Sequence, residues 1–229
     1  MDKLSYLKKV PLFVEFNDRD LGKLAKIGSV ACFDPCEKIF SEDSCGDNLY
    51  VVLSGRVKIF TQSGIKKKTL AYLEKGEFFG EMALLDMQPR SASSVAAEAC
   101  ELFVIKKKDF QKLLASHPGI SLQIMKTLCR RLRQADKEIE ALTFGDVLGR
   151  IASTLLQFSA RYGEITKDGC TIQMPLNHRD IAEIAGTGRE MVSRTLNRFR
   201  RLKVISYNAK YLMVIDAQKL KLFANSGKE

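Results

Sequence analysis

The sequence of 229 residues contains no tryptophan, two histidines and five prolines, and it has no long uninterrupted run of apolar residues. A transmembrane helix needs roughly 20 such residues, so no membrane-spanning helix is expected and no membrane partner is predicted. The N-terminal segment lacks the apolar core and small-residue cleavage site of a signal peptide. Together these absences predict a cytoplasmic protein.

Metal-binding spacings are also missing. The sequence has no C-x-x-C pair, and its two histidines, His117 and His178, lie far apart. Structural zinc and iron–sulfur sites usually draw on closely spaced ligands, so no metal cofactor is expected. The cysteines are expected to be reduced thiols or small buried side chains. They are Cys32, Cys36, Cys45, Cys100, Cys129 and Cys170, of which the first three leave a redox-sensing role open.

Positive charge is present in excess. The formal net charge is +10 and the isoelectric point is near 9.3, which favours an anionic partner. From Phe144 to the end of the sequence there are 14 Lys and Arg residues against 8 Asp and Glu. More than half of the excess therefore lies in the C-terminal part of the chain.

The pattern of apolar residues changes along the chain. Up to Ile27 it is typical of helices and loops. From Ser29 to near Lys107, short apolar stretches alternate with glycines, which is typical of an antiparallel sandwich or barrel. Two of these strands are expected to be joined by a tight turn at Ser54–Gly55.

One long helix is predicted from residue 117 to 144. Its apolar residues recur at alternating spacings of three and four, with charged residues outside the stripe. The stripe consists of Leu122, Met125, Leu128, Cys129, Leu132, Ala135, Ile139 and Leu142. Such a stripe packs either on the preceding sheet or on a second copy of the helix. The length of the helix and its flanking charges favour self-association, so a homodimer is predicted.

The last part of the chain is predicted to form a winged helix-turn-helix unit. Gly145–Asp146 is expected to act as a hinge, with Asp146 capping a new helix. The predicted elements are a helix at 147–160, a turn-rich link at 162–174, a helix at 178–185 capped by Asn177, a helix from Gly188 to near Leu202, and a hairpin of strands 204–207 and 211–215 with its turn at Asn208–Ala209. Thr187 and Glu190 have the spacing of a capping box at the start of the second of these short helices.

The stretch FGEMALLDMQPRSAS carries the groups that a compact anion with sugar hydroxyls requires. Gly80 lets backbone N–H groups approach a phosphate, and Glu81 can accept a hydrogen bond from a ribose hydroxyl. Arg90 supplies the counter-charge for a phosphodiester, and Ser91 supplies a further hydrogen bond. Met82 begins a short apolar helix between these groups, whose N-terminus favours an anion.

A second motif, NHRDIAEIAGTGREMVSRTLNRFRR, is typical of a DNA reader. Arg189, Glu190 and Arg194 lie near the start of its second helix, where a recognition helix meets base edges in the major groove. Arginine is the usual bidentate reader of guanine, and glutamate accepts from cytosine. The alternative for Glu190 is a purely capping role with Thr187. The other basic residues are expected to contact phosphates or to form a solvated face; they are Arg179, Arg198, Arg200, Arg201 and Lys203.

In this order, the two motifs resemble those of the CRP/FNR family of bacterial transcription regulators, closest to its catabolite-activator branch. The resemblance covers nearly the whole chain and implies an α+β fold. It implies an antiparallel β-roll that binds a cyclic nucleotide at 1–116, a dimerisation helix at 117–144 and a winged helix-turn-helix domain at 145–229. It also implies that the protein acts in the bacterial cytosol with RNA polymerase as a partner.

The same resemblance assigns residues to roles. It implies that Glu81 holds the ribose of the ligand, and that Arg90 and Ser91 hold its cyclic phosphate. In double-stranded DNA with pseudo-palindromic, TGTGA-like half-sites, the two arginines of the reader contact guanines and Glu190 contacts a cytosine. Thr187 and Gly188, at the start of the reading helix, are implied to lie against the DNA. Gly188 stands where the family often has a hydroxyl residue, so one phosphate contact is expected to be missing.

One departure from the family pattern concerns the base of the ligand. Counting back from the helix end FGDVLGRIA, the positions where the catabolite-activator branch has adjacent hydroxyl residues against adenine are Ala135 and Asp136. A carboxylate can accept from the adenine amino group, or from both N1–H and the amino group of guanine. Cyclic AMP is the first choice by resemblance, while cyclic GMP and cyclic di-GMP remain alternatives.

Other classes fit the sequence less well. Beyond Phe144 there is no nucleophile–base pair or metal set, so an enzyme is not expected. Oxygen-sensing members of the family use clustered N-terminal cysteines, whereas the first cysteine here is Cys32. Neither histidine lies where a haem ligand is expected.

Overall fold

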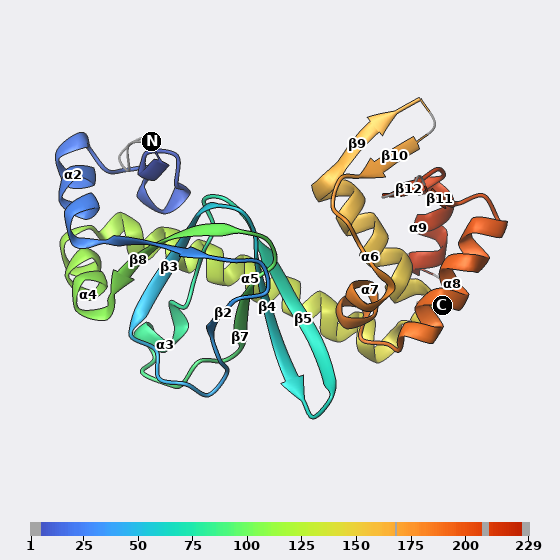
Figure 1. Cartoon of the computed structure of the whole chain (residues 1–229), viewed down its shortest axis with the longest axis horizontal. Helices are drawn as coiled ribbons and strands as arrows, with labels where there is room; N and C mark the ends of the chain where they lie inside the picture. Colours follow the sequence, from blue (N-terminus) through green and yellow to red (C-terminus); the bar gives the residue numbers. More distant parts are fainter. Residues whose placement is uncertain (1–5, 168, 208–210, 226–229) are drawn as a thin grey trace. The chain divides into compact units, whose positions relative to one another are not determined.

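The structure is a computed structural model and describes residues 6–167, 169–207 and 211–225. The chain divides into two compact units, Met1–Arg131 and Leu132–Glu229. Figure 1 shows the β-rich first unit and the largely helical second unit, which are described in turn.

The first unit contains two four-stranded antiparallel sheets. Their orders are β1-β8-β3-β6 and β2-β7-β4-β5. The strands are β1 (Ser29–Phe33), β2 (Lys38–Phe40), β3 (Asn48–Ser54), β4 (Val57–Ser63), β5 (Lys66–Leu73), β6 (Phe78–Phe79), β7 (Ser93–Ala96) and β8 (Cys100–Lys106). The predicted antiparallel β-roll is therefore confirmed.

Helices cover part of this unit. They are η1 (Pro11–Phe13), α2 (Asp18–Ile27), α3 (Met82–Leu85), α4 (Lys107–Ser116) and the start of α5 (Pro118–Phe144). One buried apolar cluster packs these helices against β3 and β8, with Phe13, Phe103 and Phe110 among its largest members. A second cluster, which includes Val52 and Leu102, lies between strands of the two sheets. Burial of these two clusters supplies the main driving force for folding of the unit.

The predicted turn at Ser54–Gly55 exists, but it does not close a hairpin. β3 pairs with β8 and β6, whereas β4 pairs with β5 and β7, so the turn carries the chain from one sheet to the other. Gly55 has φ +76°, and a Cβ there would lie 2.2 Å from the carbonyl oxygen of Ala99. Only glycine fits this crossing without strain.

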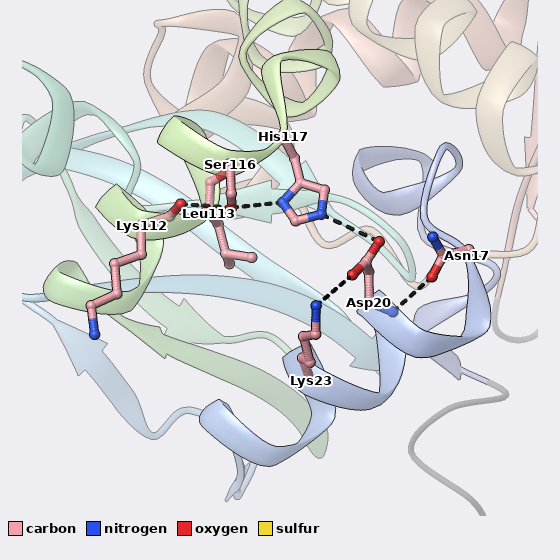
Figure 2. A network of polar contacts seen from close by, with 7 residues as sticks. All are labelled: Asn17, Asp20, Lys23, Lys112, Leu113, Ser116 and His117. Atoms are coloured by element: carbon pink, nitrogen blue, oxygen red, sulfur yellow. Dashed lines mark hydrogen bonds and ion pairs between the residues drawn. The ribbon is translucent and has the colours of Figure 1, made fainter.

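A polar network joins α2 to the start of α5 (Figure 2). Asn17 caps α2 by accepting a hydrogen bond of 2.9 Å from the backbone N–H of Asp20. Asp20 Oδ1 accepts from Lys23 Nζ at 3.1 Å, and its Oδ2 lies 3.5 Å from His117 Nε2. The ring of His117 stacks on Phe16 with 4.4 Å between centroids. The network connects segments that are far apart in sequence.

The contacts of Asp20 predict that the protein loses stability at acid pH. The hydrogen bond from Lys23, opposed by slight burial and aided by His117, holds the pKa of Asp20 below its ordinary value of 3.8. A carboxylate whose pKa is lowered by folding stabilises the fold above its unfolded pKa, and that contribution is lost as pH falls through the folded pKa. An NMR titration of the Asp20 carboxyl should therefore have a midpoint below 3.8, and Lys23→Ala should move it up. A midpoint unchanged by Lys23→Ala would contradict this account.

Helix α5 has two apolar faces, only one of which was predicted. Ile120 and Ile124 are buried in the first unit, and Leu128 is half-buried beside them. Most of the predicted stripe is exposed on the single chain: Leu122, Met125, Cys129, Leu132, Ala135, Ile139 and Leu142. The helix therefore packs on the β-roll through one face and leaves a second apolar face uncovered.

The second unit contains helices α6 (Val147–Tyr162), α7 (His178–Ala185), α8 (Arg189–Arg201) and α9 (Ala217–Asn225). Its four-stranded sheet has the order β11-β12-β10-β9. The strands are β9 (Gly163–Thr166), β10 (Gly169–Ile172), β11 (Ile205–Tyr207) and β12 (Leu212–Val214). The predicted helix-turn-helix and the two strands of its wing are confirmed, and the predicted turn at Asn208–Ala209 lies outside the described residues.

The prediction of a turn-rich link at 162–174 is wrong. This segment forms the β9–β10 hairpin, whose strand β10 pairs with β12 through Cys170 opposite Val214 and Thr171 opposite Met213. Strands of four residues have little stability alone, and the partner strand lies more than forty positions away. Tertiary pairing therefore overrides the local turn pattern.

Two of the three predicted caps are confirmed, those at Asp146 and Asn177, and the third is wrong. Asp146 caps α6 by accepting a hydrogen bond from the backbone N–H of Gly149, as expected. The capping box lies at the start of α7, however, where Asn177 and Asp180 exchange hydrogen bonds with each other's backbone N–H. Helix α8 has Gly188 as its N-cap and no side-chain cap, so the predicted box of Thr187 and Glu190 is wrong.

Two matched substitutions test this assignment of caps. Asn177→Ala is expected to lower the free energy of unfolding by about 1 kcal/mol, because loss of an N-cap side chain leaves backbone N–H groups unsatisfied. Thr187→Ala is expected to change it by less than about 0.5 kcal/mol, because the Thr187 side chain does not cap α8. Urea unfolding of both variants measures the difference. Equal losses would return the capping role to Thr187.

Candidate ligand and DNA sites

The predicted ligand motif forms one compact loop around a short helix. Gly80 has φ +81° and follows β6. Glu81 is the N-cap of α3, and its backbone carbonyl oxygen accepts hydrogen bonds of 3.0 Å from the N–H groups of Leu84 and Leu85. Glu81 is buried, with a relative exposure of 1%. A buried carboxylate is costly unless hydrogen-bond donors surround it. The donors around Glu81 therefore show which groups belong to the site.

Arg90 lies inside the β-roll. It is 4% exposed, and its Nη1 and Nη2 donate to the carbonyl oxygens of Gly80 and Asn48 at 2.6 and 2.8 Å. The guanidinium carbon lies 4.2 Å from the ring centroid of Phe40 and 5.9 Å from that of Tyr50. Aromatic faces at these distances attract a cation. Two carbonyl oxygens and two rings therefore hold the guanidinium in one orientation.

Two glycines make room for this guanidinium. A Cβ at Gly80 would lie 2.6 Å from Arg90 Nη1, and a Cβ at Gly46 would lie 3.0 Å from Arg90 Nε and 2.6 Å from the Cβ of Ala83. The sequence motif points to Gly80 but gives no reason to single out Gly46. The requirement at Gly46 arises because its loop is folded back on Arg90, where Arg90 N–H donates to Ser44 O at 2.9 Å.

The charge on Arg90 is only partly compensated. Burial lowers the pKa of its guanidinium, while Tyr50, Glu81 and Asp47 oppose that effect. The two carbonyl bonds use two of its five N–H donors, and the buried Nε–H has no hydrogen-bond partner. A buried cation with an unused donor fits an anionic ligand, whose binding would satisfy both the charge and the donor.

Glu81 meets a partner that the sequence analysis did not assign. Arg131 of α5 donates from Nη1 to Glu81 Oε1 at 2.7 Å and from Nη2 to the carbonyl oxygen of Phe78. In the sequence, Arg131 is one of the charged residues outside the apolar stripe. The spacing of the stripe places it next to Leu128 on the half-buried side of the helix, which is the one sequence signal that could have indicated its role. The carboxylate predicted to hold ribose is thus linked to the central helix.

The remaining predicted ligand residues differ in placement. Ser91 and Met82 are exposed and adjacent, with Ser91 Oγ 3.5 Å from Met82 Sδ, so the structure brings both to the loop that holds Arg90. Ala135 and Asp136 are exposed on α5, within the second unit. Their contact with the base of a ligand stays a prediction.

In the second unit, the predicted base-reading residues share one end of a helix. Arg189, Glu190 and Arg194 are exposed on the first two turns of α8, while Val192 and Leu196 on its other face are buried. Because Glu190 makes no cap, its carboxylate is not committed to its own helix. The arrangement presents two guanidinium forks and a carboxylate on one surface.

The other predicted DNA contacts lie near this surface. Gly188 is the exposed N-cap of α8, and Thr187 is half-buried, with its backbone N–H bonded to Ala182 O at 3.0 Å. Arg179 is mostly exposed on α7 and pairs with Glu183 at 3.2 Å, so its charge is already partly matched. The turn between the two helices is closed by Gly186 at φ +63°.

Arg150 was missed by sequence reasoning. From α6, its Nε donates to Ala185 O at 3.0 Å and its Nη1 donates to Gly145 O at 2.9 Å. One side chain therefore ties the hinge residue Gly145 to the C-terminal end of α7. A second tie is the contact of 2.7 Å between His178 Nδ1 and Ser193 Oγ, which joins α7 to α8.

Comparisons with known proteins match both halves of the chain. Residues 31–117 match the model of the cyclic nucleotide-binding domain, and residues 149–223 match that of the Crp-like helix-turn-helix domain. The Cyclic AMP receptor protein of Thermus thermophilus is 39% identical over 160 residues, which span 69% of this chain and 71% of that relative. This chain belongs to the CRP/FNR family of transcription regulators. It is a cyclic-nucleotide-binding, DNA-binding member of that family.

Solved structures of CRP/FNR regulators have the same fold. A mutant of CooA from Carboxydothermus hydrogenoformans has a TM-score of 0.79 and 26% identity, covering 97% of this chain and 99% of that one. The c-di-GMP responsive regulator CLP of Xanthomonas campestris has a TM-score of 0.77 and 23% identity, covering 86% of this chain and 99% of that one. The predicted family and fold class are confirmed.

The cysteines of this CRP/FNR chain lie in different environments. Cys32, Cys36, Cys45 and Cys129 are exposed, whereas Cys100 is buried. Burial raises the pKa of the Cys100 thiol to about 11, which makes it a poor nucleophile near neutral pH. Among the described residues, no three His, Cys, Asp or Glu side chains are grouped so that they could hold a metal ion. Within the same residues, no helix combines the length and apolar character of a membrane span.

Proposed function

We propose that the protein is a homodimeric transcription regulator whose affinity for DNA is controlled by a cyclic nucleotide, with cyclic AMP as the preferred ligand. The observation that carries the proposal is Arg90, a buried guanidinium with an unused donor in the middle of the β-roll. The name of the Thermus thermophilus relative, Cyclic AMP receptor protein, supports the choice of ligand.

The proposed pose follows from the donors and acceptors of the loop. Arg90 and Ser91 bind the cyclic phosphate, and Glu81 accepts from the ribose 2′-hydroxyl. Glu81 already accepts from Arg131 Nη1, and a carboxylate has lone pairs for both donors. A bound ligand would then be connected to α5 through the carboxylate of Glu81 and the guanidinium of Arg131. This contact gives the ligand a means to bias the central helix.

Selection of the base is proposed to depend on Ala135 and Asp136. The fold alone does not determine the nucleotide, since CLP is described as c-di-GMP responsive and has the same fold. Asp136 offers an acceptor to the amino group of adenine, and it offers acceptors for two donors of guanine. Cyclic GMP and cyclic di-GMP are therefore the alternatives to cyclic AMP.

Dimerisation is proposed to occur through the exposed face of α5. Leu132 and Ile139 are more than 60% exposed on the single chain and lie seven residues apart on one helix face. Apolar residues at this spacing are covered when two such helices pack together. Two Asp136 carboxylates would then approach each other and repel, and a ligand that donates to them would relieve the repulsion. The central helix α5 would then be better ordered when the ligand is bound.

The proposed output is recognition of a pseudo-palindromic operator with TGTGA-like half-sites. Arg189 and Arg194 are proposed to bind guanines in the major groove, with Glu190 accepting from a cytosine amino group. A two-fold dimer places its reading helices one turn of DNA apart, as in other dimeric helix-turn-helix regulators, the catabolite activator among them. RNA polymerase is the proposed partner, and the bacterial cytosol the proposed location.

Calorimetry with cyclic AMP, cyclic GMP and cyclic di-GMP tests the ligand, and fluorescence anisotropy with a labelled TGTGA-type operator tests the coupling. Binding of cyclic AMP is expected, together with operator binding that strengthens when it is added. The ligand can strengthen operator binding only by its differential affinity for the two states of the protein. Operator affinity that is unchanged by all three nucleotides would remove the switch from the proposal, and binding of cyclic GMP alone would change its effector.

A further inference from the structure

A second cavity lies in the first unit, outside the loop that holds Arg90. Its volume is about 270 Å³, and it is bordered by η1, by the turn between β5 and β6, and by α5. Four cationic residues line it: Lys75, Lys126, Arg130 and Arg131. The one carboxylate in its lining is that of Glu77. The cavity therefore has an excess of positive charge.

Most of this charge is not compensated. Lys126 and Arg130 make no ion pair or hydrogen bond with the described residues, and Lys75 contacts the ring of Tyr6 at 4.7 Å. The carboxylate of Glu77 already accepts the backbone N–H of Glu74 at 2.9 Å. Because the cavity is lined on two sides by cations, an anion between them would offset their mutual repulsion.

The spacing of these groups fits phosphate. Lys126 and Arg130 are one helical turn apart on α5, which puts their Cβ atoms about 5–6 Å from each other. Lys75 approaches from the β5–β6 turn, and Thr127 and Gln123 add uncharged polar groups to the lining. Arginine forks and lysine ammonium groups are the usual partners of phosphate oxygens. A chain of linked phosphates can reach the α5 pair and Lys75 at the same time.

We propose that this cavity is a second anion site, which binds a compact polyphosphate of two or three linked phosphate groups. The volume suits a ligand smaller than a drug-sized molecule, and the cationic lining favours a phosphate chain over an uncharged base. Free tripolyphosphate and the triphosphate of a nucleotide share this chemistry. The site is distinct from the one proposed for the cyclic nucleotide, because Arg90 and Ser91 do not line it. Arg131 borders the cavity and also binds Glu81, so the two sites are separated by one side chain.

Calorimetry of the full chain with sodium tripolyphosphate, at constant ionic strength and without cyclic nucleotide, tests the proposal. The double variant Lys126→Gln, Arg130→Gln is expected to bind at least tenfold more weakly than the wild type. Glutamine keeps a high helix propensity, so α5 should remain intact, and circular dichroism verifies this. ATP, ADP and AMP in parallel titrations distinguish the sources: ATP should bind about as tightly as tripolyphosphate, and AMP should not bind measurably.

The matched control is Lys108→Gln, Lys112→Gln, which removes two exposed cations at the same spacing on α4. It is expected to bind tripolyphosphate as the wild type does. Equal weakening in both double variants would mean that the net charge attracts the anion and would overturn the site. Undetectable binding to the wild type would also overturn it. Both results would leave cyclic-nucleotide binding untouched, because that binding is tested through Arg90.

Discussion

Arg90→Ala is expected to lower the affinity for cyclic AMP by at least about a hundredfold. Truncating one partner of a buried, hydrogen-bonded charge pair costs about 2–5 kcal/mol. That corresponds to roughly 30-fold to several thousand-fold in Kd. The larger part of this range is expected here because the guanidinium is buried and stacked on Phe40, so a ligand phosphate meets a desolvated charge. Calorimetry on the wild type and the variant measures the loss.

Two further variants separate the possible reasons for such a loss. Arg90→Lys keeps the positive charge but loses the fork that bonds to the carbonyl oxygens of Gly80 and Asn48, so intermediate affinity is expected. Arg19→Ala removes an exposed arginine of α2 and should bind as the wild type does. Thermal unfolding of each variant shows whether the β-roll remains folded. A folded Arg90→Ala protein with unchanged affinity would refute the assigned role of this residue.

Arg189→Ala and Arg194→Ala are each expected to reduce the preference for a TGTGA-type operator over random DNA by about 2–6 kcal/mol. A bidentate contact between arginine and guanine contributes about 1–3 kcal/mol of discrimination, and a dimer makes it in both half-sites. Exposure of both guanidinium groups on the first two turns of α8 is what makes such contacts possible. Competition binding with operator and non-operator duplexes, at one salt concentration, measures the ratio.

Arg201→Ala is the matched control for these variants. It removes an exposed arginine from the C-terminal end of the same helix, where contacts to phosphate are expected. Its loss should weaken binding to all sequences alike and reduce the slope of log affinity against log salt. If instead Arg189→Ala and Arg201→Ala behave in the same way, α8 does not read bases as proposed.

Several elements were predictable because their signals are local. The helix from 117 to 144 follows from the spacing of its apolar residues, and the observed α5 differs from it by one residue at the start. The caps of α6 at Asp146 and of α7 at Asn177 also follow from residue types at single positions. The pattern of glycines and short apolar stretches was enough to predict an antiparallel β-roll.

Other features depend on contacts that a local pattern does not encode. The path of the chain from β3 to β4 could not be read from Ser54–Gly55, because the same turn residues suit a hairpin and a crossing between sheets. The β9–β10 hairpin depends on its pairing with β12. Thr187 and Glu190 have the spacing of a capping box, yet the stronger box of Asn177 and Asp180 forms one helix earlier.

The sequence by itself determined the order of the two units and most of the chemical groups at each site, because those groups lie within short motifs of a recognisable family. Only the tertiary structure decided how they are held. The anchor of Arg90 on Asn48 spans 42 positions and the pair of Glu81 with Arg131 spans 50. Such contacts form only when strands and helices that are distant in sequence pack together and bury the apolar residues between them. That burial is what desolvates the guanidinium of Arg90 and prepares it for an anion.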